Sequence, residues 1–183
     1  MGYKKFNNVF TEIELYIIKR SLFSAEEEVQ SIYGRLTLCY FGLPQVLIKK
    51  VMNLCREVSE EDLVYDGSVM AVEYNNKYGK PNLPPHFDGD DNSMIFNFQI
   101  ESNTKWPMGI NTNVEELEDN SAIAFHPNEN IHWRTHKEFN SGEYVKMLFI
   151  RFENAAGAKD YSHMALRLDD PAFDTARQLR DSL

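Results

Sequence analysis

The sequence predicts a mainly β core with flanking helices. Apolar residues recur at helical spacing in the first 60 residues, whereas from Ser68 onward short apolar segments are separated by Gly, Asn, Asp and Pro, as in a sheet of short strands. A length of 183 residues with 43% hydrophobic residues fits one domain with its own core. Within a single domain 1–183, we expect a helical N-terminal support over residues 1–66, the β core over 67–153 and a tail containing a helix over 154–183.

Two helices are expected in the N-terminal support. Thr11 and Glu14 have the spacing of a capping box, in which each side chain satisfies the other's free backbone amide. Pro44 can begin a second helix, because its missing N–H is not needed in the first helical turn. The apolar positions of the two helices are Ile13, Ile17 and Ile18 in the first and Leu47, Val51, Leu54, Cys55 and Val58 in the second.

The β core is expected to contain at least five strands. Phe96 and Phe98 alternate with Asn97, so one face of their strand packs while the other can line something polar. A last helix is expected over residues 171–183. The expected strands are 69–74, 94–101, 121–125, 129–134 and 144–153, with turn-rich linkers at 75–85 and 111–120.

Charge and composition argue against several classes of protein. The chain has 28 acidic and 19 basic side chains, a net charge of −9, so we do not expect nucleic acid as a partner, since phosphate binding depends on clustered Lys and Arg. No apolar run reaches the roughly 18 residues of a membrane helix, and the amino terminus lacks a signal-peptide stretch. We therefore expect a cytoplasmic protein with no membrane partner. Cys39 and Cys55 indicate neither a disulfide scaffold nor a thiolate zinc site.

The segment 84–88 holds the first candidate metal ligands. His86 and Asp88 are two residues apart, so on a strand they would point the same way, roughly 6.5 Å apart along it. One ion could then receive an imidazole nitrogen and a carboxylate oxygen, a pair that suits Fe(II), Mn or Zn. By itself an HxD pair is a frequent chance pattern.

His132 is the third candidate ligand. On an alternating strand His132 and Arg134 point to the same side, so an imidazole and a cation would face one cavity. Two histidines and one carboxylate leave three open positions on an octahedral ion, as in non-haem Fe(II) oxygenases, and zinc is a less natural occupant. His126 and His136 flank His132, and either remains an alternative ligand.

Together these residues resemble the Fe(II)- and 2-oxoglutarate-dependent dioxygenases, and within them the prolyl-hydroxylase-like branch. The resemblance covers roughly residues 68–153 and rests on the order tyrosine, HxD, distal histidine, basic residue. It implies a double-stranded β-helix, a distorted, cupin-like jelly roll with helices packed outside. The segments that carry it are Val72-Glu73-Tyr74 with Gly79, His86-Phe87-Asp88, Trp106-Pro107, Asn120 to Phe125, His132-Trp133-Arg134 and Gly142.

The resemblance also implies an activity and a ligand set. Fe(II) would be held by His86, Asp88 and His132, with 2-oxoglutarate and O2 as co-substrates, and Tyr74 would contact 2-oxoglutarate. The expected reaction is hydroxylation of a small molecule or an amino-acid side chain, free or in a peptide, with release of succinate and CO2.

The residue that would pair with the distal carboxylate of 2-oxoglutarate is open. The family commonly places an Arg or Lys after the distal histidine, often as Gly-x-Arg, whereas Gly142-Glu143-Tyr144 has tyrosine there. Arg134, Lys146 and Arg151 remain as candidates, and they are not equivalent, because a guanidinium binds carboxylate in a bidentate way and Lys as a point charge. We rank Arg134 and Lys146 ahead of Arg151.

Two other classes remain open. A non-catalytic jelly-roll module for binding or structure explains the strands and helices equally well, since fold does not fix function. A cupin-like metal protein that does not use 2-oxoglutarate is the other, although cupins usually offer more histidines. Asp90 and Asp91, close to Asp88, would suit a cationic or amine-bearing substrate. The sequence sets no oligomeric state.

Overall fold

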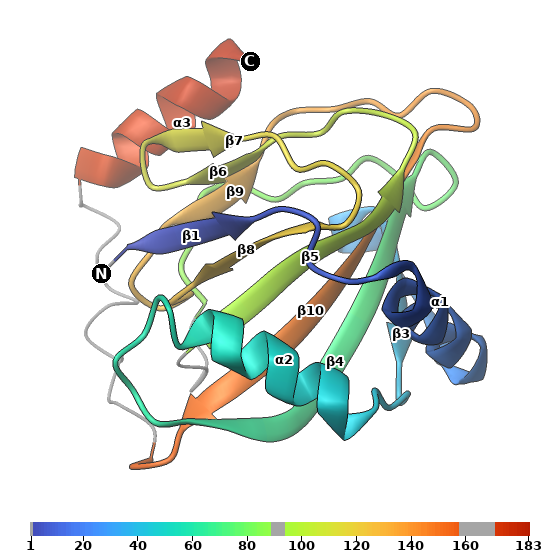
Figure 1. The fold of residues 1–183 in the computed structure, drawn as a ribbon. Helices are drawn as coiled ribbons and strands as arrows, with labels where there is room; N and C mark the ends of the chain where they lie inside the picture. The colour runs from blue at the N-terminus through green and yellow to red at the C-terminus, as the bar shows by residue number, and fades with distance from the viewer. Residues whose placement is uncertain (1, 89–93, 158–170) are drawn as a thin grey trace.

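The computed structural model describes residues 2–88, 94–157 and 171–183, and it confirms a mainly β fold with few helices (Figure 1). None of the helices in the described part of the chain is long and apolar enough to cross a membrane. The elements are β1 (Tyr3–Phe6), α1 (Glu12–Ser21), η1 (Leu22–Ser24), β2 (Glu26–Gln30), η2 (Ser31–Tyr33), β3 (Arg35–Cys39), α2 (Gln45–Cys55), β4 (Leu63–Asn75), β5 (Met94–Ser102), β6 (Met108–Ile110), β7 (Asn113–Glu115), β8 (Ser121–Phe125), β9 (His132–Arg134), β10 (Tyr144–Asn154) and α3 (Pro171–Ser182).

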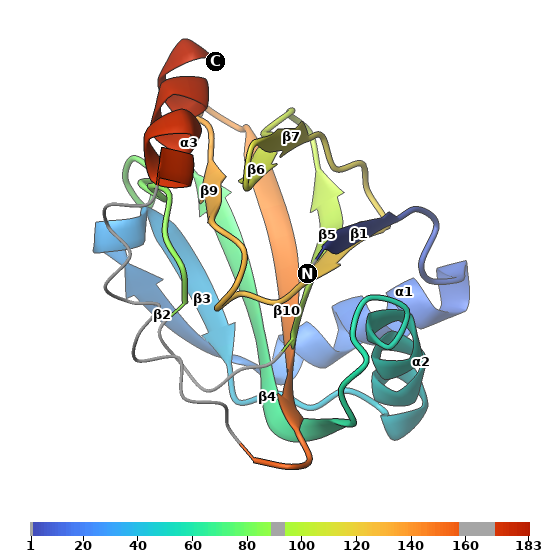
Figure 2. The same cartoon turned by 90° about the vertical axis from the view of Figure 1, so that its left-hand side faces the viewer.

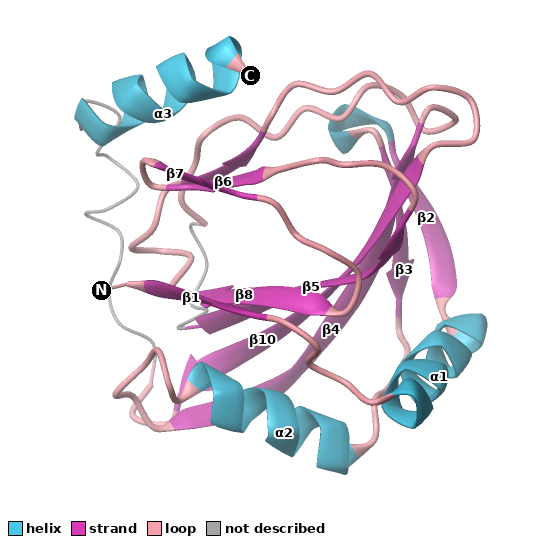
Figure 3. Cartoon of the chain, turned by 45° about the horizontal axis from the view of Figure 1, so that its top comes forward, coloured by secondary structure: helices cyan, strands magenta, loops and turns pink. Residues whose placement is uncertain are grey.

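The strands form two antiparallel sheets. The larger has seven strands in the order β1-β8-β5-β10-β4-β3-β2, and the smaller has three in the order β7-β6-β9. In Figure 2 the helices α1 and α2 lie on one side of the long strands, and β9 lies on the other. Figure 3 shows α3 beside the small sheet, far from α1 and α2.

The long central strands are buried on both faces. Alternate residues of β5 and β10, such as Phe96 and Leu148, pack against the helices in one core that includes Leu47 of α2. The residues between them, such as Ile95 and Met147, face the small sheet in a second core. Because successive side chains of a strand point to opposite faces, the same strands build both cores.

Both expected N-terminal helices are present. Thr11 caps α1 as the sequence predicts: its hydroxyl accepts from the Glu14 amide, and the Glu14 carboxylate accepts from the Thr11 amide. Pro44 precedes the first residue of α2, whose buried side is formed by Leu47, Ile48, Val51 and Cys55. The C-terminal helix α3 also lies where it was expected, over residues 171–182.

The description of residues 1–66 as a helical support is wrong in one respect, because β1, β2 and β3 also lie there. They add strands to both ends of the large sheet. β2 is an edge strand whose Glu26, Glu27 and Glu28 are exposed, so it has no apolar alternation for a sequence pattern to detect. The hairpin β6–β7 was missed for a similar reason, since each strand has three residues and β7 lies in the expected linker 111–120.

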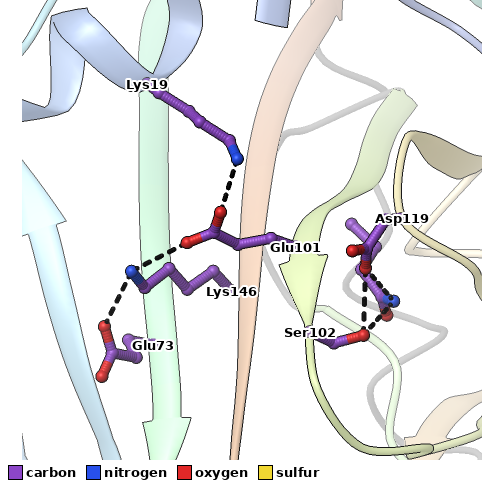
Figure 4. A network of polar contacts seen from close by, with 7 residues as sticks. Lys19, Glu73, Glu101, Ser102, Asp119 and Lys146 are labelled. Atoms are coloured by element: carbon purple, nitrogen blue, oxygen red, sulfur yellow. Dashed lines mark hydrogen bonds and ion pairs between the residues drawn. The ribbon is translucent and has the colours of Figure 1, made fainter. Parts of the chain in front are cut away.

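A chain of ion pairs joins α1 to the centre of the large sheet (Figure 4). Lys146 of β10 lies between two carboxylates, with its Nζ 3.0 Å from Glu101 Oε1 and 3.5 Å from Glu73 Oε2. Lys19 of α1 reaches the other oxygen of Glu101 at 2.5 Å. Burial would raise the pKa of Glu101, but the contacts with Lys19 and Lys146 outweigh it and hold this pKa below its usual value.

Replacing Glu101 with Gln should lower the free energy of unfolding at neutral pH by about 0.5–1 kcal/mol, the range for solvent-screened ion pairs. The pKa of Glu101 is lower in the folded than in the unfolded chain. Its contribution is therefore present above the unfolded-state pKa and is lost as the pH falls through the folded value. Urea unfolding of wild type and Glu101→Gln at pH 7 and pH 3 measures this. Glu60→Gln, at an exposed position, is the control; an equal loss at both pH values would contradict the prediction.

Candidate metal centre

The backbone pairs His86 directly with His132 of β9. The His86 amide donates to the His132 carbonyl at 3.1 Å, and the His132 amide donates to the His86 carbonyl at 2.9 Å, forming an isolated antiparallel bridge. Opposite residues of such a pair project to the same side, and the two imidazole centroids are 4.2 Å apart. The Asp88 amide donates to the Pro127 carbonyl at 3.1 Å, which fixes the second residue of the HxD pair beside them.

Each imidazole is oriented by a backbone carbonyl. Nδ1 lies 2.7 Å from the Pro84 oxygen in His86 and 3.1 Å from the Asn130 oxygen in His132. When Nδ1 carries the proton, Nε2 has a free lone pair, as in metal-binding histidines whose other ring nitrogen donates a hydrogen bond. The two Nε2 atoms lie 3.5 and 3.4 Å from Asp88 Oδ1. All three ligand atoms lie within 4.8 Å of one another.

The charges of this cluster suit a cation. Burial would raise the pKa of Asp88, but the contacts with His132 and His86 outweigh it and hold this pKa well below its usual range. Burial lowers the pKa of His86, and its contacts with Asp88 and with backbone carbonyls more than reverse that effect. The carboxylate thus stays ionised and places a negative charge between the two imidazoles. Two imidazole nitrogens and one carboxylate oxygen form a set consistent with Fe(II).

Packing behind the three candidate metal ligands holds them in place. Trp133, which alternates with His132, lies with its indole over Gly109 of β6, where a Cβ would otherwise be. Phe87, between the two HxD ligands, packs edge-to-face against Phe173 of α3, with ring centroids 5.3 Å apart. The small sheet and α3 therefore support both segments that carry ligands.

A cavity of about 420 Å³ adjoins the three ligands and lies between the two sheets. This volume is in the usual range for small-molecule sites. Its polar lining away from the ligands includes Arg35, Asn97, Arg134 and Arg151, and its apolar lining includes Met70, Ile95, Phe125 and Phe149.

Arg134 is a buried cation in this pocket, only 4% exposed. Nη1 donates to the Trp106 carbonyl at 2.6 Å, and Nη2 lies 3.5 Å from Met147 Sδ. The guanidinium also lies over the Trp106 ring, which packs against Tyr74 with centroids 4.7 Å apart. Burial lowers the pKa of Arg134 to about 10, and the neighbouring Tyr74 opposes this.

The guanidinium of Arg134 has no carboxylate partner among the residues that the structure describes. Arginine has five N–H donors, and two of those of Arg134 have a described partner. A buried charge without a counter-ion is costly. An anionic ligand that entered the pocket would remove that cost, and a carboxylate would match the guanidinium in a bidentate way.

The structure does not bring Lys146 to the pocket. Met147, Phe149 and Arg151 face the small sheet, so Lys146 points to the helix side, where it pairs with Glu101. The alternation of side chains along β10 is the physical reason. Lys146 is therefore not a pocket residue, whereas Arg151, which was ranked behind it, is one. Tyr74, Arg134 and Arg151 all line the cavity.

Arg35 is a pocket residue that was not expected from the sequence. Arg35 of β3 pairs in register with Tyr74 of β4, and its Nη1 lies 3.4 Å from the Tyr74 hydroxyl. The alternation of Arg35 and Thr37 with Leu36 and Leu38 was the available signal for this strand.

The flanking histidines do not join the cluster. His126 is buried in the turn before Pro127, and His136 is exposed with its Nε2 3.1 Å from Asp181. Asp90 and Asp91, which suggested a cationic substrate, lie outside the described residues.

Comparisons with known proteins identify the fold as a double-stranded β-helix. No family model and no curated protein matches the chain. Solved structures do. An oxidoreductase of the 2OG-Fe(II) oxygenase family from Burkholderia pseudomallei is 11% identical, with 86% of each chain covered and a TM-score of 0.58. A prolyl hydroxylase from Trichoplax adhaerens, in complex with a peptide fragment of the hypoxia inducible factor oxygen degradation domain, is 10% identical, with 85% of this chain and 84% of that chain covered and a TM-score of 0.59.

A third match is the non-haem α-ketoglutarate-dependent epimerase from nogalamycin biosynthesis. It is 9% identical, with 84% of this chain and 78% of that chain covered and a TM-score of 0.62. Identities this low establish likeness of fold and leave the chemistry to the residues of the site. The expected double-stranded β-helix is confirmed by these matches.

Replacing Gly109 with Ala should destabilise the protein and weaken metal binding together. The added Cβ would overlap the buried indole of Trp133, so the ring must move or β9, which carries His132, must shift. We expect a loss of about 1–3 kcal/mol in the free energy of unfolding, as for overpacked cores. Urea unfolding and titration with Co(II) measure the two effects. Gly42→Ala, where nothing lies near the added Cβ, should change neither; an unaltered Gly109→Ala protein would contradict the packing described.

Proposed function

We propose that this protein is an Fe(II)- and 2-oxoglutarate-dependent dioxygenase that hydroxylates a small molecule or an amino-acid side chain, free or in a peptide. The observation that carries the proposal is the convergence of His86, Asp88 and His132 on one point, beside a pocket with a buried guanidinium that has no carboxylate partner among the described residues. When bound, the ferrous ion and the keto acid would supply O2 activation, in which one oxygen atom enters succinate as CO2 is released and the other enters the substrate.

The chain's own residues would bind and orient the two ligands. Arg134 lies two residues from His132 on the same side of β9, about 6.5 Å along the strand, a spacing that a five-carbon diacid chelating the metal can bridge. Arg134 would then pair with the distal carboxylate, beside the Tyr74 hydroxyl. The apolar side chains of Phe125 and Phe149 would keep water from the reacting centre.

The solved structures of similar fold support the oxygenase class and leave the type of reaction to experiment. One is described as a prolyl hydroxylase and another as an epimerase. Hydroxylation is favoured here by the resemblance of the motif order to the prolyl-hydroxylase-like branch. Incorporation of one 18O atom from 18O2 into the product distinguishes the two reactions, because an epimer contains no new oxygen.

Anaerobic addition of Fe(II) and 2-oxoglutarate to the metal-free protein should produce the visible charge-transfer band of a chelated keto acid. Asp88→Ala and His132→Ala should each abolish the band, because each removes a ligand atom. His136→Ala is the matched control and should retain it, since His136 is exposed and paired with Asp181. Metal binding without a band would favour the cupin-like alternative, and no metal binding at all would favour a structural module.

Replacing Arg134 with Gln should raise, by at least tenfold, the 2-oxoglutarate concentration at which the charge-transfer band reaches half of its maximal absorbance. A lost hydrogen bond to a charged group costs about 1.5–3 kcal/mol, and 1.4 kcal/mol is a factor of ten. Lys146→Gln removes a cation that faces away from the pocket and should leave this concentration unchanged. Titration of both variants, with Co(II) binding as a check that the metal site is intact, makes the comparison. Weakening in Lys146→Gln alone would refute the assigned anchor.

A further inference from the structure

Arg151 is a second guanidinium in the pocket, and the proposed co-substrate site does not use it. We propose that Arg151 binds an oxyanion of the primary substrate, with a carboxylate as the best geometric match, and that Asn97 accepts a hydrogen bond from the same molecule. This inference rests on the proposed function, because it assigns the Arg134 end of the pocket to 2-oxoglutarate.

The two arginines enter the pocket from different positions along β10. Arg134 contacts Met147 of β10 through Nη2, and Arg151 lies four residues further along the same face of that strand, so its backbone is about 13 Å from that of Met147. Arg151 is in register with Ile95, which is in register with Phe125 of β8. The Phe125 ring lies 5.0 Å from the His132 ring. Arg151 therefore belongs to a row of paired residues across β10, β5 and β8, and this row ends beside the ring of His132.

The charge of the pocket lining favours an anion even after the cofactors are bound. Arg35, Arg134 and Arg151 stand against one carboxylate, Asp88, among the described lining residues. A ferrous ion and a 2-oxoglutarate dianion cancel each other's charge, so the positive surplus persists in the loaded site. Arg151 itself makes no hydrogen bond or ion pair within residues 2–88, 94–157 and 171–183.

Asn97 supplies an independent observation that points to a ligand. It lines the same cavity, is 6% exposed and uses its Nδ2 to contact Met108 Sδ at 3.4 Å. Its Oδ1 is buried without a donor in the described structure. An acceptor left unpaired in this way is costly, and an N–H or O–H of a ligand would satisfy it. Asn97 lies two residues from Ile95, the register partner of Arg151.

These residues define the chemistry of the substrate. The side chains around Arg151 and Asn97 are apolar, namely Met70, Ile95, Phe125 and Phe149. The cavity of about 420 Å³ must also hold the keto acid, so the space left is that of a small molecule or one amino-acid residue. The structure thus fits a small acid with an apolar body and one hydrogen-bond donor, as in an N-acylated apolar amino acid. This is the opposite of the cationic substrate that Asp90 and Asp91 suggested.

The test is isothermal titration of the protein loaded with Co(II) and saturating 2-oxoglutarate. The probes are N-acetyl-leucine, its uncharged amide and 3-methylbutyl phosphate. We expect N-acetyl-leucine to bind and its amide to bind at least tenfold more weakly. Arg151→Gln should weaken N-acetyl-leucine at least tenfold, Arg151→Lys should restore part of the affinity, and Arg56→Gln, at an exposed position at the end of α2, should match wild type. The affinity of Arg151→Gln for 2-oxoglutarate should be unchanged.

Each outcome decides the proposal. Tight binding of the phosphate and not of the carboxylate supports the oxyanion site and assigns it to a phosphorylated substrate. The proposal is overturned by equal affinity in wild type and Arg151→Gln, by failure of both anions to bind, or by loss of 2-oxoglutarate binding in Arg151→Gln, which would place Arg151 in the co-substrate site. If wild type binds Co(II) but not 2-oxoglutarate, the proposed function fails; titration of the protein loaded with Co(II) alone then decides the anion site separately.

Discussion

The reciprocal backbone hydrogen bonds between His86 and His132 are the constraint on which the site depends. They place both imidazoles on the same side of the His86–His132 pair. Because side chains alternate along each segment, the residues next to the two histidines then point to the opposite side. Asp88 returns to the side of His86, while Phe87 and Trp133 point away and are packed by α3 and the small sheet. Because β9 has only three residues, this packing rather than a long hydrogen-bonded ladder holds the candidate metal ligands in register.

Elements with a pattern of their own could be predicted from the sequence, and elements that exist only through pairing could not. The capping box of α1 and the alternation in β5 are local signals. β2, with three exposed glutamates, becomes a strand only because β3 offers it an edge. The same limit affected the site. The His86-Asp88 pair and His132 could be identified, but β10 is apolar on both faces, so its sequence does not show whether Lys146 or Arg151 faces the cavity.

The buried guanidinium of Arg134 shows how the pocket combines folding with binding. The Trp106 carbonyl, the Trp106 ring and the Met147 thioether contact the guanidinium and satisfy some of its N–H donors. These contacts let Arg134 be buried without a carboxylate partner in the described structure. A carboxylate partner within the protein would have been more stabilising, but it would have neutralised the charge that a ligand needs. In the proposed function the site is thus organised before the ligand arrives, and ligand binding would add to stability because it would supply a counter-ion that the described residues do not.

The described charged side chains that line the pocket are mainly positive, whereas the net charge of the chain is negative. A protein of net charge −9 does not attract anions over long distances, and salt screens such fields within roughly 10 Å. The cationic lining of Arg35, Arg134 and Arg151 acts at contact distance, in an environment where an unpaired charge is costly and a paired one is favourable. The anion binding that we propose would therefore arise inside the cavity, from the register of β3, β9 and β10, and not from steering at the surface. A fold shared at 9–11% identity therefore leaves the residues that line the cavity free to differ, and it is those residues that carry the chemistry.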